Sequence, residues 1–279
     1  MNIAIIGCGY VGTAVATHWH GDCGHYITAT TTTKERVTEL EQVAQQVVVM
    51  RGEDKSALQA VIQNQDAILL SIAPTGRRPV DPQIYKETYL DTAKNLVWAL
   101  QYAPSVKQLI YTGSYSVYGN TDGAWVDEES LVTPGNKKSE VLHDTEQVLL
   151  QATRENLRVC LLRLGGIYGP ERKLVKIFGR LAGTTFAGDG EYFTNWVHLD
   201  DIVSAIAFIL LSRLEGIYNL VDDVPWITRH LVERVCEVHG LPPVSWDASP
   251  SNLRSGSVRV SNHKIKAAGY QFIHPALLI

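Results

Sequence analysis

The feature that most constrains the fold is a glycine-rich turn near the N-terminus. Residues 7–12 read Gly-Cys-Gly-Tyr-Val-Gly, directly after a short apolar run at residues 1–6 and before an apolar stretch at residues 11–19. The apolar run is typical of a buried strand, and the stretch after it is typical of a buried helix. The chain therefore opens with a strand, a tight turn and a helix, which is the first half of a βαβ unit.

The same alternation of apolar runs and helical segments continues toward the middle of the chain. Further strands are predicted near residues 26–30, 47–50, 67–72, 108–112 and 159–164. The helices between them are predicted near residues 34–45, 55–62, 83–102 and 139–153. Strands separated by helices pair in parallel through right-handed crossovers, and such a sheet is covered by helices on both faces.

The predicted fold class is therefore α/β, with a Rossmann-type doubly wound parallel sheet and a smaller C-terminal substrate lobe. The dinucleotide-binding domain is expected to span residues 1–164. The smaller lobe is expected to span residues 165–279, with the chain returning to the main domain at about residues 196–222. Residues 114–138, rich in Gly, Pro and Asp, form a connection too long to be routine, which predicts an active-site loop.

Composition is that of an ordinary globular protein. The 279 residues are 45% hydrophobic, and 25 Lys and Arg stand against 29 Asp and Glu, so the net charge of −4 does not suggest a nucleic-acid surface. The longest apolar stretch, residues 205–211, is far short of the roughly 18 residues that span a bilayer. With neither a secretory signal nor a transit peptide at the N-terminus, we expect a cytoplasmic protein. The scattered cysteines, without a Cys-x-x-Cys pair, predict reduced thiols and no bound metal.

The spacing of Gly7, Gly9 and Gly12 fits the dinucleotide-binding pattern G-x-G-x-x-G. Gly7 permits the tight turn, Gly9 lets a pyrophosphate approach the backbone, and Gly12 lets the helix pack closely on the strand. The helix N-terminus, at Tyr10 and Val11, faces the anion. The alternative is a tight turn without a ligand. The position of the pattern between a strand and a helix favours a bound dinucleotide.

The end of the second strand indicates which dinucleotide is preferred. An Asp or Glu there would accept hydrogen bonds from the adenosine ribose and would repel a 2′-phosphate. Residues 28–36 instead offer hydroxyls, among them Thr31, and two cations, Lys34 and Arg36. The alternative is that these cations only solvate a helix start, but cations in a first turn oppose the macrodipole and so invite an anionic partner. We therefore expect NADP to be favoured, with NAD as the alternative.

Motifs in the rest of the chain occur in a characteristic order. They read Gly-Ser-Tyr-Ser-Val-Tyr-Gly at residues 113–119, Leu-Arg-Leu continuing to Ile-Tyr-Gly-Pro at 162–170, Trp-Val-His-Leu-Asp-Asp at 196–201 and Ile-Tyr-Asn-Leu at 217–220. With the glycine turn before them, they resemble the extended short-chain dehydrogenase/reductases, the NAD-dependent epimerase/dehydratase family, over nearly the whole chain. The resemblance implies that Ser114 is the catalytic Ser, that Ser71 and Ala73 lie in the turn along the cofactor, and that Glu53 meets the adenine amino group.

The resemblance fails at the family's Tyr-x-x-x-Lys pair. In the family this Tyr exchanges a proton with the substrate oxygen, while the Lys lowers the pKa of the Tyr and holds the nicotinamide ribose. Residues 133–134 and 146–147 fix the register, which puts Lys138 at the Tyr position and Leu142 at the Lys position. Because a positioned proton donor is worth about 10²- to 10⁴-fold in rate, the standard chemistry should be weak or replaced.

Candidates for a substitute lie nearby in the sequence. Lys138 could serve as the proton donor if burial and the cofactor's charge lowered its pKa, although a solvated Lys at a helix start is the simpler interpretation. Tyr115, next to Ser114, is a second candidate. Tyr118 and His143 are weaker ones, since Tyr118 belongs to a motif whose Tyr generally packs.

The C-terminal lobe is expected to form the substrate side. Arg172 follows Gly-Pro, where the family resemblance places phosphate or sugar-nucleotide groups, and Trp125 and Trp196 could supply apolar walls. The alternatives are a surface cation and a core Trp. Residues 198–201 are expected to cap a helix that begins near Ile202 rather than to bind a ligand.

Two functions are consistent with these residues. The first is an NADP-linked oxidoreductase or epimerase-like enzyme acting on a small carbonyl, alcohol or sugar-nucleotide substrate held by Ser114. The second is a non-catalytic dinucleotide-binding redox sensor or scaffold, which Lys138 and Leu142 favour. The expected partners are the dinucleotide and an unidentified small molecule, with a homodimer as the assembly to test. Nucleic acid and membrane are not expected as partners.

Overall fold

A computed structural model of the chain describes residues 1–74, 80–247 and 256–279. Within these described residues, no helix is long and apolar enough to cross a membrane. The chain divides into two compact units. The first unit comprises Met1–Ser114, Asn136–Arg163 and Val203–Ile217, and the second comprises Tyr115–Gly135, Leu164–Ile202 and Tyr218–Ile279.

A seven-stranded sheet forms the centre of the α/β fold. In their order across the sheet, the strands are β12 (Gly216–Leu220), β7 (Arg158–Leu164), β5 (Gln108–Ser114), β4 (Ala67–Leu70), β1 (Asn2–Ile6), β2 (Tyr26–Thr31) and β3 (Gln46–Val49). β1 pairs in parallel with β2 on one side and with β4 on the other. β2 also pairs in parallel with β3, and β4 with β5. The predicted doubly wound parallel sheet is confirmed, and its strand order reverses between β1 and β4.

The central strands are apolar along their whole length because both faces of the sheet are covered. Ile3 and Ile5 of β1 and Leu69 of β4 are fully buried. Ile5 lies beside Ala29 of β2 and Leu69 of β4 in the parallel register. Parallel pairing aligns the carboxyl ends of these strands, which is the edge where ligands bind in open α/β sheets.

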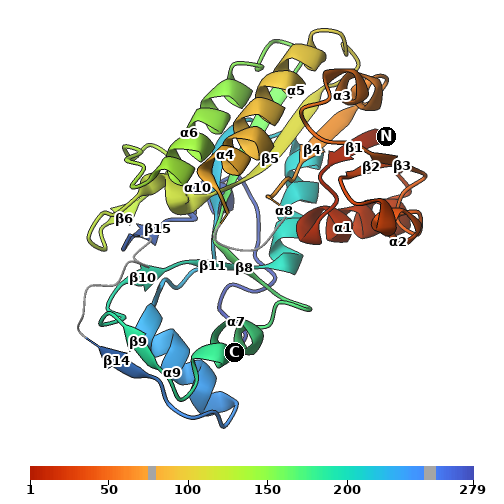
Figure 1. Cartoon of the computed structure of the whole chain (residues 1–279). Coiled ribbons are helices and arrows are strands. Elements are labelled where there is room, and N and C mark those ends of the chain that lie inside the picture. Colours follow the sequence, from red (N-terminus) through yellow and green to blue (C-terminus); the bar gives the residue numbers. More distant parts are fainter. Residues whose placement is uncertain (75–79, 248–255) are drawn as a thin grey trace. The chain divides into compact units, whose positions relative to one another are not determined.

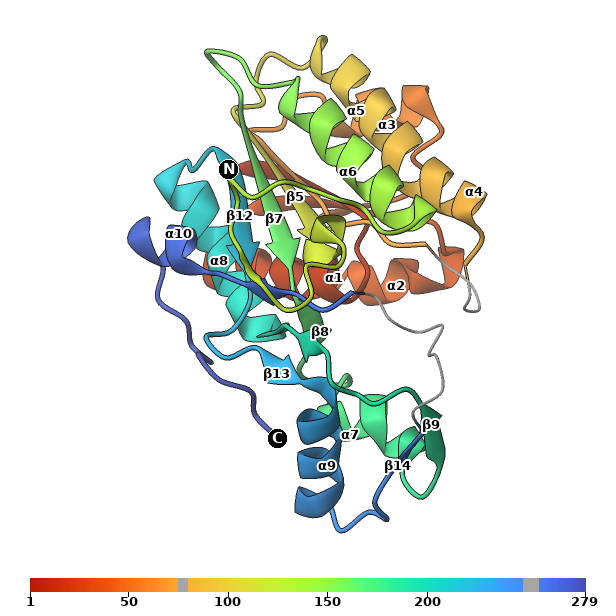
Figure 2. The same cartoon turned by 90° about the vertical axis from the view of Figure 1, so that its left-hand side faces the viewer.

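Helices cover both faces of this sheet (Figures 1 and 2). One face carries α3 (Lys55–Ile62), α4 (Pro82–Lys86), α5 (Thr92–Leu100) and α6 (Lys137–Leu150). The other face carries α1 (Tyr10–Thr17), α2 (Val37–Leu40) and α8 (Leu199–Ser212). A π-helical segment, Glu87–Asp91, joins α4 to α5, and another, His18–Asp22, follows α1.

Two expectations about helix limits are wrong. The helix predicted over residues 34–45 consists of a 3-10 turn, Lys34–Arg36, and the short α2. After α2, backbone N–H groups bond to the carbonyl oxygen three residues earlier, which ends the helix in a tight turn. The helix expected near Ile202 begins earlier, at Leu199. It begins there because Nδ1 of His198 accepts the N–H of Asp200 at 3.1 Å, which satisfies a donor of the first turn.

The second unit is built from short paired strands and small apolar cores. One core joins Tyr118 and Val126 to Val258 and Val260, and another joins Tyr168 to Leu231 and its neighbours. The strand pairs are β6 (Trp125–Val126) with β15 (Arg259–Val260), β8 (Gly166–Tyr168) with β11 (Trp196–His198), β10 (Phe193–Thr194) with β13 (Trp226–Ile227), and β9 (Thr185–Ala187) with β14 (Ser245–Asp247). The helices are α7 (Leu174–Phe178), α9 (Thr228–Val238) and α10 (His263–Ala267), with 3-10 turns at Tyr115–Tyr118 and Gly179–Leu181.

Candidate functional site

The glycine turn lies between β1 and α1, and its three glycines are not equivalent. Gly7 has φ +92°, and a Cβ there would lie 2.5 Å from the carbonyl oxygen of Ser71. A Cβ on Gly12 would lie 2.5 Å from the carbonyl oxygen of Gly7. A Cβ on Gly9, in contrast, would meet nothing within 4 Å. The fold itself requires Gly7 and Gly12, whereas Gly9 borders open space.

The N-terminus of α1 adjoins that space. The helix begins at Tyr10, and no acidic side chain occupies its first turn. The first N–H groups of a helix have no partner inside the helix, and the aligned peptide dipoles attract negative charge. Tyr10 and Val11 therefore begin a helix end that can receive a phosphate next to Gly9.

The end of β2 closes the turn from the side. The N–H of Gly7 donates to Oγ1 of Thr30 at 3.0 Å, and the N–H of Cys8 donates to the carbonyl oxygen of Thr30 at 2.8 Å. Cys8 is buried, and this burial raises the pKa of its thiol to about 12. The thiol therefore stays neutral near pH 7 and puts no negative charge beside the turn.

Arg36 also contacts the turn, which the sequence did not reveal. Its guanidinium donates to the carbonyl oxygen of Cys8 and, at 3.2 Å, to Oγ1 of Thr13. Its other partner is Glu39, 2.7 Å away, and the hydrogen bond to Glu39 raises the pKa of Arg36. The guanidinium is thus a brace between the glycine turn and the start of α2, while Lys34 is exposed.

A pocket opens where β1, β2 and β3 end, next to Gly7. Thr31, assigned to the nucleotide from the sequence, is one of its lining residues. Gly52 belongs to the lining as well, and a Cβ on it would overlap the side chain of Thr92. Glu53 follows Gly52 directly and is exposed. The full lining is Ile6, Gly7, Thr30, Thr31, Thr32, Met50, Gly52, Ile72 and Thr92.

The ends of β4 and β5 carry further predicted site residues. Ser71 directly follows β4, and its Oγ accepts a hydrogen bond from Oγ1 of Thr112 at 3.1 Å. Ala73 is exposed. Ser114 is the last residue of β5 and is half-buried, and the half-buried Tyr115 starts the next 3-10 turn. Ser71 and Ser114 therefore end neighbouring parallel strands at the same edge of the sheet.

The helix α6 carries Lys138 and Leu142. Oδ1 of Asn136 caps it by accepting the N–H groups of Lys138 at 3.0 Å and Ser139 at 3.1 Å. Lys138 is half-buried, with Nζ 5.5 Å from the centre of the Tyr85 ring. Leu142 is buried in the core. The ammonium of Lys138 thus lies against an aromatic ring at the first turn of α6.

A buried ion pair joins α6 to β7. Arg163 donates from Nε to Oε1 of Glu146 at 3.0 Å and from a terminal nitrogen to Oε2 at 2.7 Å. The two side chains are 2% and 1% exposed. The pair joins β7 to α6, the helix that carries Lys138. No local sequence pattern indicated the pairing.

The weaker candidates for the missing Tyr are also placed. Tyr118 is fully buried, and its hydroxyl donates to Oδ1 of Asn219 at 2.9 Å, which agrees with a packing role. His143 is half-buried, with Nδ1 4.0 Å from Oε2 of Glu146.

The three predicted substrate residues all belong to the second unit. Trp125 is 54% exposed, and the guanidinium of Arg259 lies 5.3 Å from its ring centre. Arg172 is exposed on the turn after Gly169. Trp196 packs edge-on against Phe178 in an apolar core. Their roles toward a substrate stay predictions.

Comparison with known proteins adds to this geometry. The model of the NAD dependent epimerase/dehydratase family matches residues 3–220. Protein YeeZ of Escherichia coli (strain K12) is 28% identical over 287 residues, covering 99% of this chain and 97% of that protein. A functionally unknown conserved protein from Silicibacter pomeroyi DSS superposes with a TM-score of 0.79 at 24% identity, covering 99% of this chain and 94% of that one. The dTDP-glucose 4,6-dehydratase DesIV from Streptomyces venezuelae, with NAD bound, superposes with a TM-score of 0.81 at 18% identity, covering 96% and 90%.

Proposed function

This chain belongs to the NAD dependent epimerase/dehydratase family, and from that premise we propose that it is an NADP-preferring oxidoreductase with a non-standard active site. Its substrate is a small carbonyl, alcohol or sugar nucleotide. A bound nicotinamide dinucleotide supplies the hydride acceptor or donor for this chemistry.

The observation that carries the proposal is the open space at Gly9. At Gly7 and Gly12 the protein's own backbone fills the space that a Cβ would need, so folding alone explains these two glycines. Gly9 is not explained in that way, because a Cβ there would have no atom within 4 Å. A pyrophosphate on the N-terminus of α1 accounts for the missing side chain.

The pocket beside Gly7 suits the adenosine end of the same ligand. The lining of this pocket is mainly apolar, and Met50 and Ile72 offer surface for a base, while the hydroxyls of Thr30 and Thr31 accept the N–H groups of Gly7 and Thr33. Exposed Lys34 supplies a cation for a 2′-phosphate, and Glu53 directly follows the pocket residue Gly52. Ser71 and Ala73 would then lie along the remainder of the cofactor.

The proposed chemistry requires a hydrogen-bond donor and a proton donor near the reacting oxygen. Ser114, at the carboxyl end of β5, would orient the substrate oxygen through its hydroxyl. Lys138 would exchange the proton from Nζ, with Tyr115 as the second candidate. The substrate side is assigned to Trp125, Arg172 and Trp196, and DesIV, a dehydratase of a sugar nucleotide, is the precedent for that substrate class.

The first prediction separates the roles of Lys34 and Arg36. Lys34→Ala should weaken NADPH binding about five- to tenfold and leave NADH binding within about twofold, because it removes only a charge for the 2′-phosphate. Arg36→Ala should weaken both nucleotides, because Arg36 braces the glycine turn through Cys8. Calorimetric titration with each nucleotide measures both effects, and Lys94→Ala on α5 is the matched control. An equal loss of NADPH and NADH affinity in Lys34→Ala would remove Lys34 from the 2′-phosphate site.

The second prediction concerns the positions of the family's Tyr and Lys. The wild type should reduce a generic carbonyl slowly, and Lys138→Tyr with Leu142→Lys should raise that rate at least about tenfold by supplying a proton relay. Because Leu142 is buried, circular dichroism must first show that the double variant folds. Ser114→Ala should lower the activity of both proteins.

A fast wild type unaffected by Lys138→Ala would move the proton donor to Tyr115 or His143, because the hydroxyl of Tyr118 is buried and bonded to Asn219. If Ser114→Ala also had no effect, hydride transfer at this site would be wrong. The second candidate function, a dinucleotide-binding sensor or scaffold without turnover, would then be favoured by Lys138 and Leu142 at the positions of the family's pair.

A further inference from the structure

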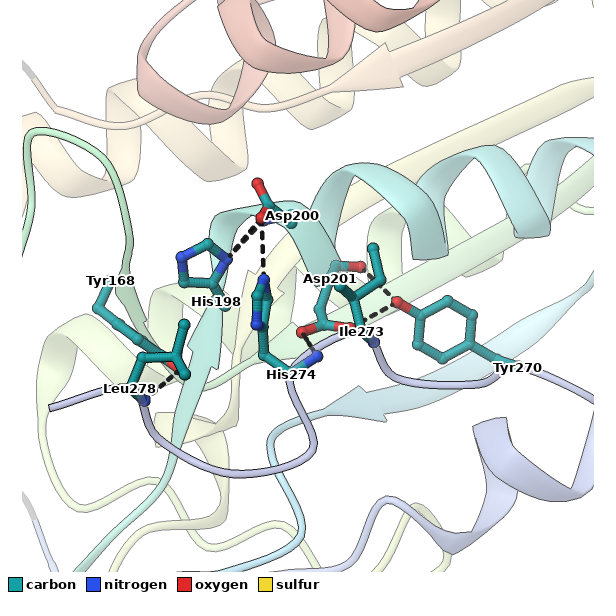
Figure 3. Close-up of polar contacts among 8 residues, drawn as sticks. All are labelled: Tyr168, His198, Asp200, Asp201, Tyr270, Ile273, His274 and Leu278. Carbon is teal, nitrogen blue, oxygen red and sulfur yellow. Dashed lines mark hydrogen bonds and ion pairs between the residues drawn. The ribbon is translucent and has the colours of Figure 1, made fainter.

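Two histidines and one aspartate converge in the second unit, away from the glycine turn in sequence (Figure 3). His198 ends β11, Asp200 lies in the first turn of α8, and His274 belongs to the C-terminal segment. Oδ2 of Asp200 lies 2.9 Å from Nε2 of His274 and 3.3 Å from Nδ1 of His198. The two imidazole rings lie 4.1 Å apart between centres.

These separations are close to those of ligands around a tetrahedral metal ion. Bonds of about 2.0–2.2 Å at tetrahedral angles place neighbouring ligand atoms roughly 3.3–3.6 Å apart. One potential ligand atom from each of the three residues already lies within 4.8 Å of the others. Opening the cluster by a few tenths of an ångström would admit an ion, which would replace the hydrogen bond from the Asp200 N–H to His198.

The surroundings hold the three ligands in place. Asp201, next to Asp200, is fully buried and accepts the hydroxyl of Tyr270 at 3.0 Å and the N–H groups of Ile273 at 2.7 Å and His274 at 3.0 Å. Asp201 therefore fixes the C-terminal segment on α8, and His198 is buried at the end of β11. The carboxylates of Asp200 and Asp201 also offset the positive end of the α8 dipole, which by itself disfavours a cation.

We propose that His198, Asp200 and His274 bind a divalent zinc-type ion, with a fourth position left to water. Two imidazoles and a carboxylate are a donor set that suits Zn²⁺ better than Mg²⁺ or Ca²⁺. The ion clamps the C-terminal segment to α8 and β11, and so adds to the stability of the second unit rather than to the chemistry at the glycine turn. The sequence gives no local sign of this site, because His274 lies 74 residues after Asp200 in the chain.

The test uses the full chain without an affinity tag, freed of metal with a chelator. Titration calorimetry should give one Zn²⁺ per chain with a dissociation constant of about 1 µM or tighter. A hundredfold excess of Zn²⁺ over that constant should raise the melting temperature by about 5 °C. Mg²⁺ should do neither. Co²⁺ should give the absorption bands of a tetrahedral site in the wild type, a readout that needs no variant.

Asp200→Asn and His274→Ala should each weaken Zn²⁺ at least about tenfold. Asp200 is half-exposed, and asparagine has nearly the same shape as aspartate. If the circular dichroism of Asp200→Asn is unchanged, loss of Zn²⁺ binding in this variant is therefore not caused by misfolding. The matched control is His18→Ala, because His18 lies beside Asp22 and 3.8 Å from Sγ of Cys23 and is the rival place for adventitious zinc. His18→Ala should bind Zn²⁺ as the wild type does.

Two results would overturn the proposal. One is the absence of saturable Zn²⁺ binding up to 100 µM. The cluster would then be only a polar contact of two imidazoles with one carboxylate. The other is Zn²⁺ binding that survives in Asp200→Asn and His274→Ala and is lost in His18→Ala. Neither result bears on dinucleotide binding, which is measured separately.

Discussion

Gly9→Val should abolish dinucleotide binding, with a loss of at least about a hundredfold in affinity for NADPH and NADH alike. A Cβ at Gly9 meets no protein atom within 4 Å, and φ at this residue is −82°, so neither a clash nor a left-handed φ excludes a side chain there. Because ψ is −149°, outside the usual β region, valine should cost some stability but not the fold. Its isopropyl group would occupy the space proposed for the pyrophosphate. Calorimetric titration measures the affinity, and thermal unfolding with circular dichroism measures the fold.

Two other glycines make this result specific. Gly21→Val introduces the same side chain at an exposed glycine with nothing within 4 Å and should leave nucleotide affinity unchanged. Gly12→Val forces a Cβ to within 2.5 Å of the Gly7 carbonyl oxygen and should lower the melting temperature. If Gly9→Val bound NADPH as tightly as the wild type, the turn would serve the fold alone.

Removing one partner of the buried pair between Glu146 and Arg163 should destabilise the protein severely. Glu146→Leu or Arg163→Met leaves the other charge buried without its counter-ion, which costs about 3–5 kcal/mol. That is a large part of the roughly 5–15 kcal/mol by which proteins are stable. The double variant should regain most of the lost free energy of unfolding, because two apolar side chains then replace both charges. Each ionic side chain of the pair is 2% exposed or less, so the site suits apolar groups.

Urea unfolding of the two single variants and the double variant forms a complete cycle. The exposed pair of Arg234 and Glu237, with side chains 53% and 71% exposed, is the matched control, and Glu237→Gln should change the unfolding midpoint little. Single variants as stable as the wild type would mean that the pair does not hold α6 on β7. The position of Lys138 would then need another explanation.

Local sequence patterns were sufficient to predict the sheet and the glycine turn. The apolar runs that predicted β1, β4 and β7 are continuous because these strands are buried on both faces, so the residues themselves carry the signal. The roles of Gly7 and Gly12 could be predicted because the turn forces their conformation and their close packing. The resemblance to the family assigned Ser114 the role of the catalytic Ser, which stays a prediction, and the structure has Ser114 as the last residue of β5 rather than the first residue of the loop after it.

The remaining features depend on residues far apart in the chain. Arg36 could be assigned to a phosphate from its neighbours, but its bond to Cys8 exists only once α2 folds back on the turn. The pairing of Glu146 with Arg163 requires α6 to lie on β7, and no spacing rule connects the two residues. His274 meets His198 only through the course of the C-terminal segment. Contacts of this kind are properties of the tertiary fold and leave no periodic trace in the sequence.

The structure of the wild-type protein crystallised with NADPH tests dinucleotide binding at the glycine turn most directly. The pyrophosphate should lie on the N-terminus of α1 beside Gly9, with the adenosine end in the pocket lined by Thr31 and Met50 and the 2′-phosphate toward Lys34. A nucleotide bound with its pyrophosphate away from residues 7–12, or a protein that takes up no NADPH at millimolar concentration, would show that the glycine turn is not the binding site.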